Sequence, residues 1–230
     1  MSKLFVIQSN YIPWKGYFDA INKADVVVIY DEMQYTKNDW RNRNKIKTSN
    51  GTQWLTIPVL MSGKFGQKIN ETQVFDKKWA IKHWKTLKQN YSKATYFKEI
   101  EELLFPIYNN IMTDNLSEIN MLFIKAILYY LGITTKIIRS KDLVLHGDKN
   151  ERLIGLCNQL NCNRYISGPA AKSYMDLELF ASNHIKVEFL EYSGYKVHKQ
   201  LFNDFEPLVS IVDILFNEGP NSRDYVFNDL

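Results

Sequence analysis

The sequence is poor in the residues that build disulfide frameworks and metal sites. It has two cysteines, Cys157 and Cys162, and four scattered histidines, no two of which lie four residues apart. This composition favours neither a disulfide scaffold nor a metal centre. There is no uncharged apolar run of about 18 residues, and the apolar segment 4–7 is too short for a signal peptide. We therefore expect a metal-free cytoplasmic protein that makes no contact with a membrane.

Internal repeats, low-complexity tracts and linkers rich in proline or glycine are also missing. The 230 residues are 45% hydrophobic and 23% charged, which is ordinary for a folded protein with one substantial core. We expect one domain over residues 1–230. The net charge of +4 is modest, so it does not require nucleic acid but is compatible with an anionic ligand.

Apolar strands and helices alternate at both ends of the chain. The unbroken run VVVIY (26–30) is typical of a strand covered on both faces. Strands are predicted at 4–8, 26–30, 134–139, 164–168 and 185–190. Helices are predicted at 15–24, 77–91 and 117–131, after Asp148, and from Pro207 to Gly219.

Residues 40–60 predict a β-hairpin around the pair Asn50-Gly51, which favours a type I′ turn. The hairpin and the helices that follow it interrupt the alternation of strands and helices. We therefore predict an α/β protein with a Rossmann-type, nucleotidyltransferase-like parallel sheet and an insertion at about 40–131. Ligands of such sheets bind beyond the carboxyl ends of the strands.

A polar and aromatic stretch, QSNYIPWKGYF (8–18), follows the first predicted strand. Backbone N–H groups at the start of the next helix attract anions, and a glycine permits close approach. Aromatic rings here can stack on a base or sugar; alternatively, Trp14 and Tyr17 pack between helix and sheet. The candidate binding residues are Gln8, Asn10, Tyr11, Trp14, Gly16 and Tyr17.

The segment DWRNRNKIK (39–47) carries a cation at every second position. On a strand these cations share one face, with neighbours about 6–7 Å apart. They form either a solvated edge or the site of an anion, for which arginine offers bidentate contacts. The candidate ligand-binding residues are Arg41, Arg43, Asn44 and Lys45.

The segment SGPAAKSY (167–174) directly follows another predicted strand. A lysine at the start of a helix opposes the helix dipole, so Lys172 indicates a nearby anion. The spacing is not that of a P-loop. The candidate residues are Ser167, Gly168, Lys172 and Tyr174.

Carboxylates and a basic helix complete the list of candidates. Asp31 ends a buried strand and is a candidate general base, whereas Asp213 lies within a regular helical pattern. Lysines alternate with Trp and Tyr over 76–93, which is compatible with RNA binding. The simpler interpretation is that these lysines form the solvent-exposed face of an amphipathic helix.

In combination, these motifs resemble the WbqC-like proteins of bacteria. That family begins with a QPxYLPWxGYF signature, and the residues matching it are Gln8, Tyr11, Pro13, Trp14, Gly16, Tyr17 and Phe18. A W-x-x-R-N-x-I motif is matched by Trp40, Arg43, Asn44 and Ile46. A YxSG…Y motif is matched by Tyr165, Ser167, Gly168 and Tyr174, and SIxDxLFNxG resembles residues 210–219. Ser9 departs from the proline common in the family but removes no chemical group.

This resemblance implies a role in O-antigen and lipopolysaccharide biosynthesis, with acyl or aminoacyl decoration of amino sugars carried on nucleotides. A weaker resemblance is to pantothenate synthetase-like nucleotidylyltransferases, which share a strand, a turn containing proline and a DVVV strand. Their H-x-G-H signature is missing here, because Trp14 and Gly16 stand in its place.

Three functions are carried forward. The first is a transferase that acylates the amine of a nucleotide-linked amino sugar. Its general base is Asp31, and its oxyanion is stabilised by Lys172 or by N–H groups near Gly168. The second is an adenylating enzyme that uses ATP and Mg²⁺, with Asp31 as metal ligand. The third is a module that binds RNA or tRNA through 77–93 and the hairpin.

In the first of these functions, the three cations hold the pyrophosphate, the aromatic residues stack on base or sugar, and Gln8 and Asn10 orient the sugar. The cations are Arg41, Arg43 and Lys45, and the stacking residues are Tyr11 and Trp14. The donor, which could be an aminoacyl-tRNA, and the oligomeric state are left open.

Overall fold

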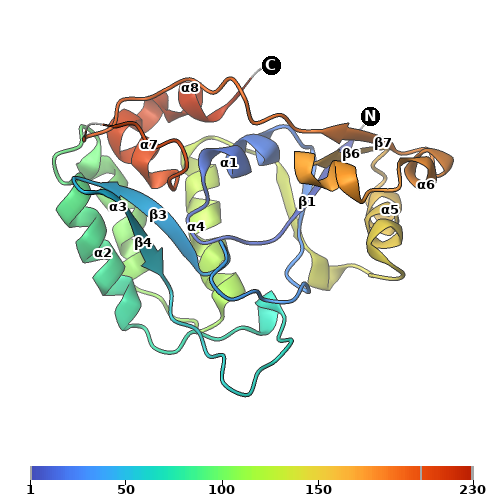
Figure 1. Cartoon of the computed structure of the whole chain (residues 1–230), viewed down its shortest axis with the longest axis horizontal. Coiled ribbons are helices and arrows are strands. Elements are labelled where there is room, and N and C mark those ends of the chain that lie inside the picture. The colour runs from blue at the N-terminus through green and yellow to red at the C-terminus, as the bar shows by residue number, and fades with distance from the viewer. Residues whose placement is uncertain (1, 203, 229–230) are drawn as a thin grey trace.

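A computed structural model describes residues 2–202 and 204–228 and centres on a five-stranded parallel sheet (Figure 1). Its strands are β1 (Lys3–Ile7), β2 (Val26–Ile29), β5 (Lys136–Arg139), β6 (Arg164–Ser167) and β7 (Lys186–Phe189), in the order β5-β2-β1-β6-β7. This is the strand order of a Rossmann-type sheet, in which the direction of winding reverses between β1 and β6. The predicted α/β class and parallel sheet are confirmed.

The sheet is covered on both faces, as its unbroken Val and Ile runs predict. Phe5, Val27 and Ile29 face a large core that also contains α1 (Lys15–Asn22). Leu4, Val28 and Tyr165 face the opposite way. They pack with α5 (Lys149–Gln159) and α6 (Leu177–Ser182). The capping box predicted at Asp148 is present, because its carboxylate accepts from two N–H groups of α5.

The hairpin and three helices lie between β2 and β5 along the chain. The hairpin is formed by β3 (Arg43–Thr48) and β4 (Gly51–Thr56), and Gly51 has a φ of 101° in the turn. The helices are α2 (Lys78–Tyr91), α3 (Phe97–Asn109) and α4 (Leu116–Tyr130), with a short 3₁₀ turn at Ile69–Glu71. The predicted hairpin is confirmed, but β3 begins at Arg43, so Arg41 precedes the strand.

The C-terminal segment differs from the prediction. The last helices are α7 (Val212–Glu218) and α8 (Arg223–Val226), so a helix starting at Pro207 is wrong. Residues 207–210 instead form an irregular segment that is held by its neighbours, because Ser210 N–H donates to the Lys45 carbonyl and Ile211 N–H to the Pro13 carbonyl. This segment therefore joins the hairpin to the loop after β1.

Within the described ranges, no helix has the length and apolar character needed to cross a bilayer. Two short 3₁₀ turns, Ser140–Asp142 and Pro169–Ser173, follow β5 and β6, and a third, Gly219–Ser222, separates α7 from α8.

Candidate functional site

A cleft of about 320 Å³ lies beside the carboxyl end of β1, between the loop after this strand and the hairpin. Three segments far apart in the sequence line it. The lining residues are Asn10, Trp14, Trp40, Asn44, Lys45 and Leu208. The cleft thus brings together four of the residues predicted to bind substrate, Asn10, Trp14, Asn44 and Lys45, at the edge of the sheet where Rossmann-type proteins bind ligands.

Arg41 fixes the two amide side chains of the loop after β1. Its Nη1 donates to Asn10 Oδ1 and its Nη2 to Gln8 Oε1, both at 2.8 Å, while Asp39 Oδ2 lies 3.8 Å from Nη2. Because the amide oxygens face Arg41, the amide NH₂ groups of Gln8 and Asn10 point away from it. Gln8 and Asn10 therefore hold a guanidinium in place, a role that the sequence did not predict.

Two tryptophans form an exposed platform on the hairpin side of the cleft. Trp40 and Trp54 are 43% and 39% exposed, and their ring centroids lie 5.5 Å apart. The guanidinium carbon of Arg43 lies 4.1 Å from the Trp54 ring centroid and Lys45 Nζ lies 5.2 Å from it. Large exposed aromatic rings flanked by cations suit the flat face and negative charge of a nucleotide.

The opposite wall of the cleft is built around Trp14. Its ring packs edge-on against Tyr192 at 5.1 Å and Tyr195 at 6.3 Å. Gly16 is required here, because a Cβ at this position would lie 2.4 Å from the Trp14 ring. Trp14 is therefore wedged in place by packing, and its stacking on a base or sugar stays a prediction.

Lys15, the residue after Trp14, has a buried side chain. Lys15 is only 7% exposed; its Nζ donates to the Lys196 carbonyl and lies 4.7 Å from the Tyr195 ring centroid. Burial lowers the pKa of Lys15 below its ordinary value. The contacts of Lys15 hold the segment after β7 against the start of α1.

Asn44 braces the floor of the cleft. Its Nδ2 donates to the carbonyls of Ile12 and Tyr11, at 2.8 and 3.2 Å, and its Oδ1 accepts from Lys45 N–H. Ile12 has a φ of 37°, a strained conformation for a β-branched residue. The carbonyl of Ile12 also accepts from Ser210 Oγ at 2.6 Å. Asn44 therefore acts as a clamp on the loop, and its contact with a ligand in the cleft stays a prediction.

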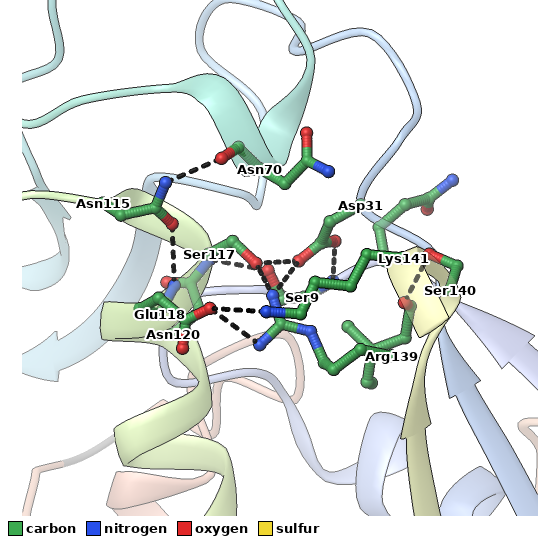
Figure 2. Close-up of polar contacts among 12 residues, drawn as sticks. Ser9, Asp31, Asn70, Asn115, Ser117, Glu118, Asn120, Arg139, Ser140 and Lys141 are labelled. Atoms are coloured by element: carbon green, nitrogen blue, oxygen red, sulfur yellow. Dashed lines mark hydrogen bonds and ion pairs between the residues drawn. The ribbon is translucent and has the colours of Figure 1, made fainter. Parts of the chain in front are cut away.

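Asp31 lies in the interior, in the polar network shown in Figure 2. The side chain is 2% exposed; Oδ1 accepts from Ser9 N–H at 2.8 Å and Oδ2 from the Ser117 hydroxyl. Asn120 Nδ2 in turn donates to Ser9 Oγ and to the Arg41 carbonyl, at 3.2 and 2.9 Å. A carboxylate so enclosed cannot reach a substrate amine, which corrects the expectation that Asp31 is the general base.

The same network ties β5 to α4. Arg139 donates to Ser117 Oγ, lies 3.9 Å from Asp31 Oδ2 and 3.3 Å from Glu118 Oε1 (Figure 2). Lys141 reaches Glu118 at 4.0 Å. The Asp31 carboxylate therefore has Arg139 nearby and accepts hydrogen bonds from Ser9 N–H and the Ser117 hydroxyl. These contacts anchor the loop after β1.

Tyr11 packs in the core instead of facing the cleft. It is fully buried, and its hydroxyl bonds to His83 Nδ1 at 2.9 Å and to Tyr108 at 2.6 Å. Burial raises the pKa of Tyr11 well above its ordinary value and lowers the pKa of His83 to about 4. The expectation that Tyr11 stacks on a base or sugar is therefore wrong, because its ring has no exposed face.

Tyr17 is likewise in the core at 2% exposed, and its hydroxyl donates to the Gln8 carbonyl at 3.1 Å. Burial is the main cause that raises its pKa. Tyr17 therefore supports the loop through the backbone and does not stack on a ligand, as the packing alternative predicted.

The residues after β6 are only partly gathered at the site. A Cβ on Gly168 would lie 3.9 Å from the Tyr192 hydroxyl, so this glycine is close to the Trp14 wall. Ser167 is buried at the end of β6. Lys172 Nζ lies 5.4 Å from the ring centroid of Phe189 in β7. The ring centroid of Tyr174 lies 5.6 Å from Lys149 Nζ at the start of α5. No contact in the described part of the chain joins Lys172 or Tyr174 to the cleft.

No group of three or more His, Cys, Asp or Glu side chains suited to a metal occurs within residues 2–202 and 204–228. The cleft instead carries neutral amides, tryptophans and cations, a set of groups that fits an organic anion better than a metal ion.

Trp54 and Leu208 are site residues that the sequence did not single out, and Trp40 was noted only as part of a motif. Leu208 belongs to an irregular segment with no hydrophobic period, so no local signal places it at the cleft. Trp54 directly opposes Lys45 in the hairpin register. Extending the period-two analysis across the predicted turn places these two residues on one face.

The fold and cleft define a Rossmann-type α/β protein with an aromatic, basic cleft at the carboxyl edge of its sheet. The chain belongs to the WbqC-like protein family, whose sequence profile matches residues 8–225. It is 50% identical over 226 residues to an uncharacterized protein of Mycobacterium tuberculosis, in an alignment that covers 98% of both chains. No solved structure matches the sequence.

Proposed function

We propose that this protein is a transferase of bacterial surface-polysaccharide biosynthesis that moves an acyl or aminoacyl group onto the amine of a nucleotide-linked amino sugar. The observation that carries the proposal is the guanidinium of Arg41, held by two amide oxygens beside a cleft lined by tryptophans and Lys45. The position at the strand-order reversal of a Rossmann-type sheet favours a nucleotide as the bound group.

Each side of the cleft has its own role in this proposal. Lys45 and the oriented cations Arg41 and Arg43 neutralise the pyrophosphate of the nucleotide sugar. Trp40 offers its exposed face to the base or sugar ring, and Trp14 closes the opposite wall. The amide NH₂ of Asn10, directed away from Arg41, donates to a sugar hydroxyl or to the developing oxyanion.

The chemistry is amide formation. The lone pair of the neutral sugar amine attacks the acyl carbon, a C–N bond forms, and the bond from that carbon to the oxygen or sulfur of the carrier breaks. The amine gives up one proton, which ends on the departing carrier or in water. Asp39 Oδ2 lies 3.8 Å from Arg41 Nη2, beside this group of residues, and we assign the Asp39 carboxylate as the first acceptor of the proton.

A product assay tests this function. Purified protein is incubated with UDP- or dTDP-linked amino sugars as acceptors. The donors are acyl-CoA, aminoacyl-tRNA, or a free carboxylic acid with ATP and Mg²⁺. Products are identified by mass spectrometry. The matched control is the same nucleotide linked to a sugar with a hydroxyl in place of the amine. The expected result is an acylated product from the amino sugar alone, reduced in Asn10→Ala. Transfer to neither sugar with any donor contradicts the proposal.

A further inference from the structure

A second groove of about 440 Å³ lies on the far side of Trp54, between β4 and α2. Its walls include Trp54 and Thr56 from the strand and Lys78, Trp79, Lys82 and His83 from the helix. Figure 1 shows the hairpin and α2 side by side at one end of the molecule, away from β6 and β7. This groove is distinct from the cleft, because the two share no lining residue.

The two elements that form this groove carry charge of one sign. Residues 41–56 and α2 (78–91) contain no Asp or Glu, and each contains four cations. Of these, Lys78 and Lys82 line the groove, whereas Lys47 is buried with its Nζ donating to the Asp204 carbonyl, and Lys88 lies 3.4 Å from Glu101. Asp76, whose Oδ1 accepts from Lys78 N–H at 2.8 Å, is the one carboxylate that lines the groove within the described residues. A positive potential of this kind attracts polyanions.

Aromatic side chains accompany the charge. Trp54 is 39% exposed and contacts Trp40, whose ring is 5.5 Å away, so the two rings form a continuous surface from groove to cleft. At the bottom of the groove, Trp79 is 3% exposed, and its indole Nε1 has no hydrogen-bond partner among the described residues. Trp79 therefore forms the closed floor of the groove, whereas Trp54 presents a ring that a ligand can reach.

We propose that this groove binds single-stranded nucleic acid. A basic channel with exposed aromatic rings is the arrangement by which proteins hold single strands, with phosphates on the cations and bases on the rings. Lys78 and Lys82 contact phosphates, and Trp54 stacks on a base. The bound strand follows the Trp54–Trp40 surface toward the cleft.

This inference does not depend on the acyl-transfer reaction, because Trp54, Lys78 and Lys82 have no role in that reaction as proposed. If the proposed function holds, the bound nucleic acid also brings the acyl donor to the cleft. A strand that ends near Trp40 presents its terminal ribose beside the cleft, so that an ester carried there lies next to the sugar amine. Binding of nucleic acid and binding of nucleotide sugar are measured separately below, so that one can fail while the other stands.

Fluorescence anisotropy with a labelled single strand of about twelve nucleotides tests the proposal. Separate arms use RNA, DNA, the corresponding duplex, and polyphosphate as a competitor without bases. With the phosphate contacts of Lys78 and Lys82 the log–log slope against salt is about −1.4, so a threefold rise in salt weakens binding about fivefold. We expect single strands to bind more tightly than the duplex and polyphosphate to compete poorly.

Variants connect the binding to the groove. Trp54→Ala removes one stacking ring and weakens binding by about tenfold or more, whereas Trp54→Phe retains most of the affinity. Lys78→Ala with Lys82→Ala lowers the magnitude of the salt slope by about 1.4, since each phosphate contact contributes about 0.7. Lys136→Ala, an exposed lysine on β5, is the matched control and leaves the binding unchanged.

The lysine variants lie on the exposed face of α2, so they test the groove even if Trp54→Ala fails to fold. A protein that binds no single strand at low salt overturns the proposal. So does binding that is equal for duplex and single strand, or binding that neither Trp54→Ala nor the lysine pair weakens.

Discussion

The guanidinium of Arg41 donates to the amide oxygen of Gln8 at 2.8 Å, although 33 residues separate them along the chain. This bond joins the first turn after β1 to the segment that leads into the hairpin. This bond explains why a glutamine follows the first strand. The side-chain oxygen of Gln8 orients the guanidinium of Arg41 beside the cleft, while Gln8 itself is only partly exposed.

Removing this acceptor tests the role of Gln8. In Gln8→Leu, Arg41 loses one of two amide oxygens, so affinity for a nucleotide-linked amino sugar falls by about ten- to a hundredfold, the range for a hydrogen bond to a charged group. Thermal-shift titration measures the change. Gln89→Leu, on the exposed face of α2, is the control and leaves the affinity unchanged. Unchanged affinity in Gln8→Leu contradicts the proposed role.

Asp31→Asn separates an anchor from a general base. As an anchor, Asp31 holds Ser9 N–H and the Ser117 hydroxyl, so the substitution lowers the free energy of unfolding by about 1–3 kcal/mol. Urea denaturation measures it, and Ser117→Ala in a double-mutant cycle shows coupling between the two residues. A variant as stable as the parent but without turnover would restore Asp31 as the base.

Buried His83 makes stability depend on pH. Desolvation lowers its pKa from 6.5 to about 4 against an opposing hydrogen bond to the Thr56 backbone. Between these values the unfolded chain binds a proton that the folded chain excludes, so the free energy of unfolding rises as pH increases from 4 to 6.5. The contribution is roughly 3 kcal/mol.

Urea denaturation at a series of pH values checks this contribution. His83→Gln, which retains hydrogen-bonding groups near Tyr11, is expected to flatten the rise in this window. The idea fails if the parent and His83→Gln show the same slope.

Two glycines give opposite predictions for the same substitution. Gly16→Ala places a Cβ 2.4 Å from the Trp14 ring, which forces the ring out of its position and weakens both stability and ligand binding. Gly155→Ala, within α5, meets no atom within 4 Å and is expected to stabilise the protein by about 0.5–1 kcal/mol. Melting temperatures and binding of nucleotide sugar measure both variants. Equal effects at the two positions contradict the wedge described for Gly16.

The sheet follows from the sequence because its strands are continuous apolar runs bounded by polar loops, as at 26–30. The loops at the carboxyl ends follow from the same pattern, which is why Asn10, Trp14 and Lys45 are placed at the cleft. The orientation of individual side chains does not follow. Tyr11 and Trp14 are both aromatic residues of one loop, but only long-range contacts with His83 and Tyr108 send Tyr11 into the core.

Long-range contacts also explain the error at Pro207. Proline is favourable at the first position of a helix, but the backbone of Ser210 and Ile211 bonds to the hairpin and to the loop after β1. These partners are distant in sequence, so local propensity could not indicate them, and Leu208 reaches the cleft for the same reason.

The most direct test of the central proposal is isothermal titration calorimetry of the protein with UDP- and dTDP-linked amino sugars. We expect one saturable site for at least one of them, with affinity reduced about tenfold or more in Arg41→Ala and in Lys45→Ala and unchanged in Lys136→Ala. Heat that does not saturate with either ligand, or affinity that is equal in all four proteins, contradicts a nucleotide-sugar site in this cleft.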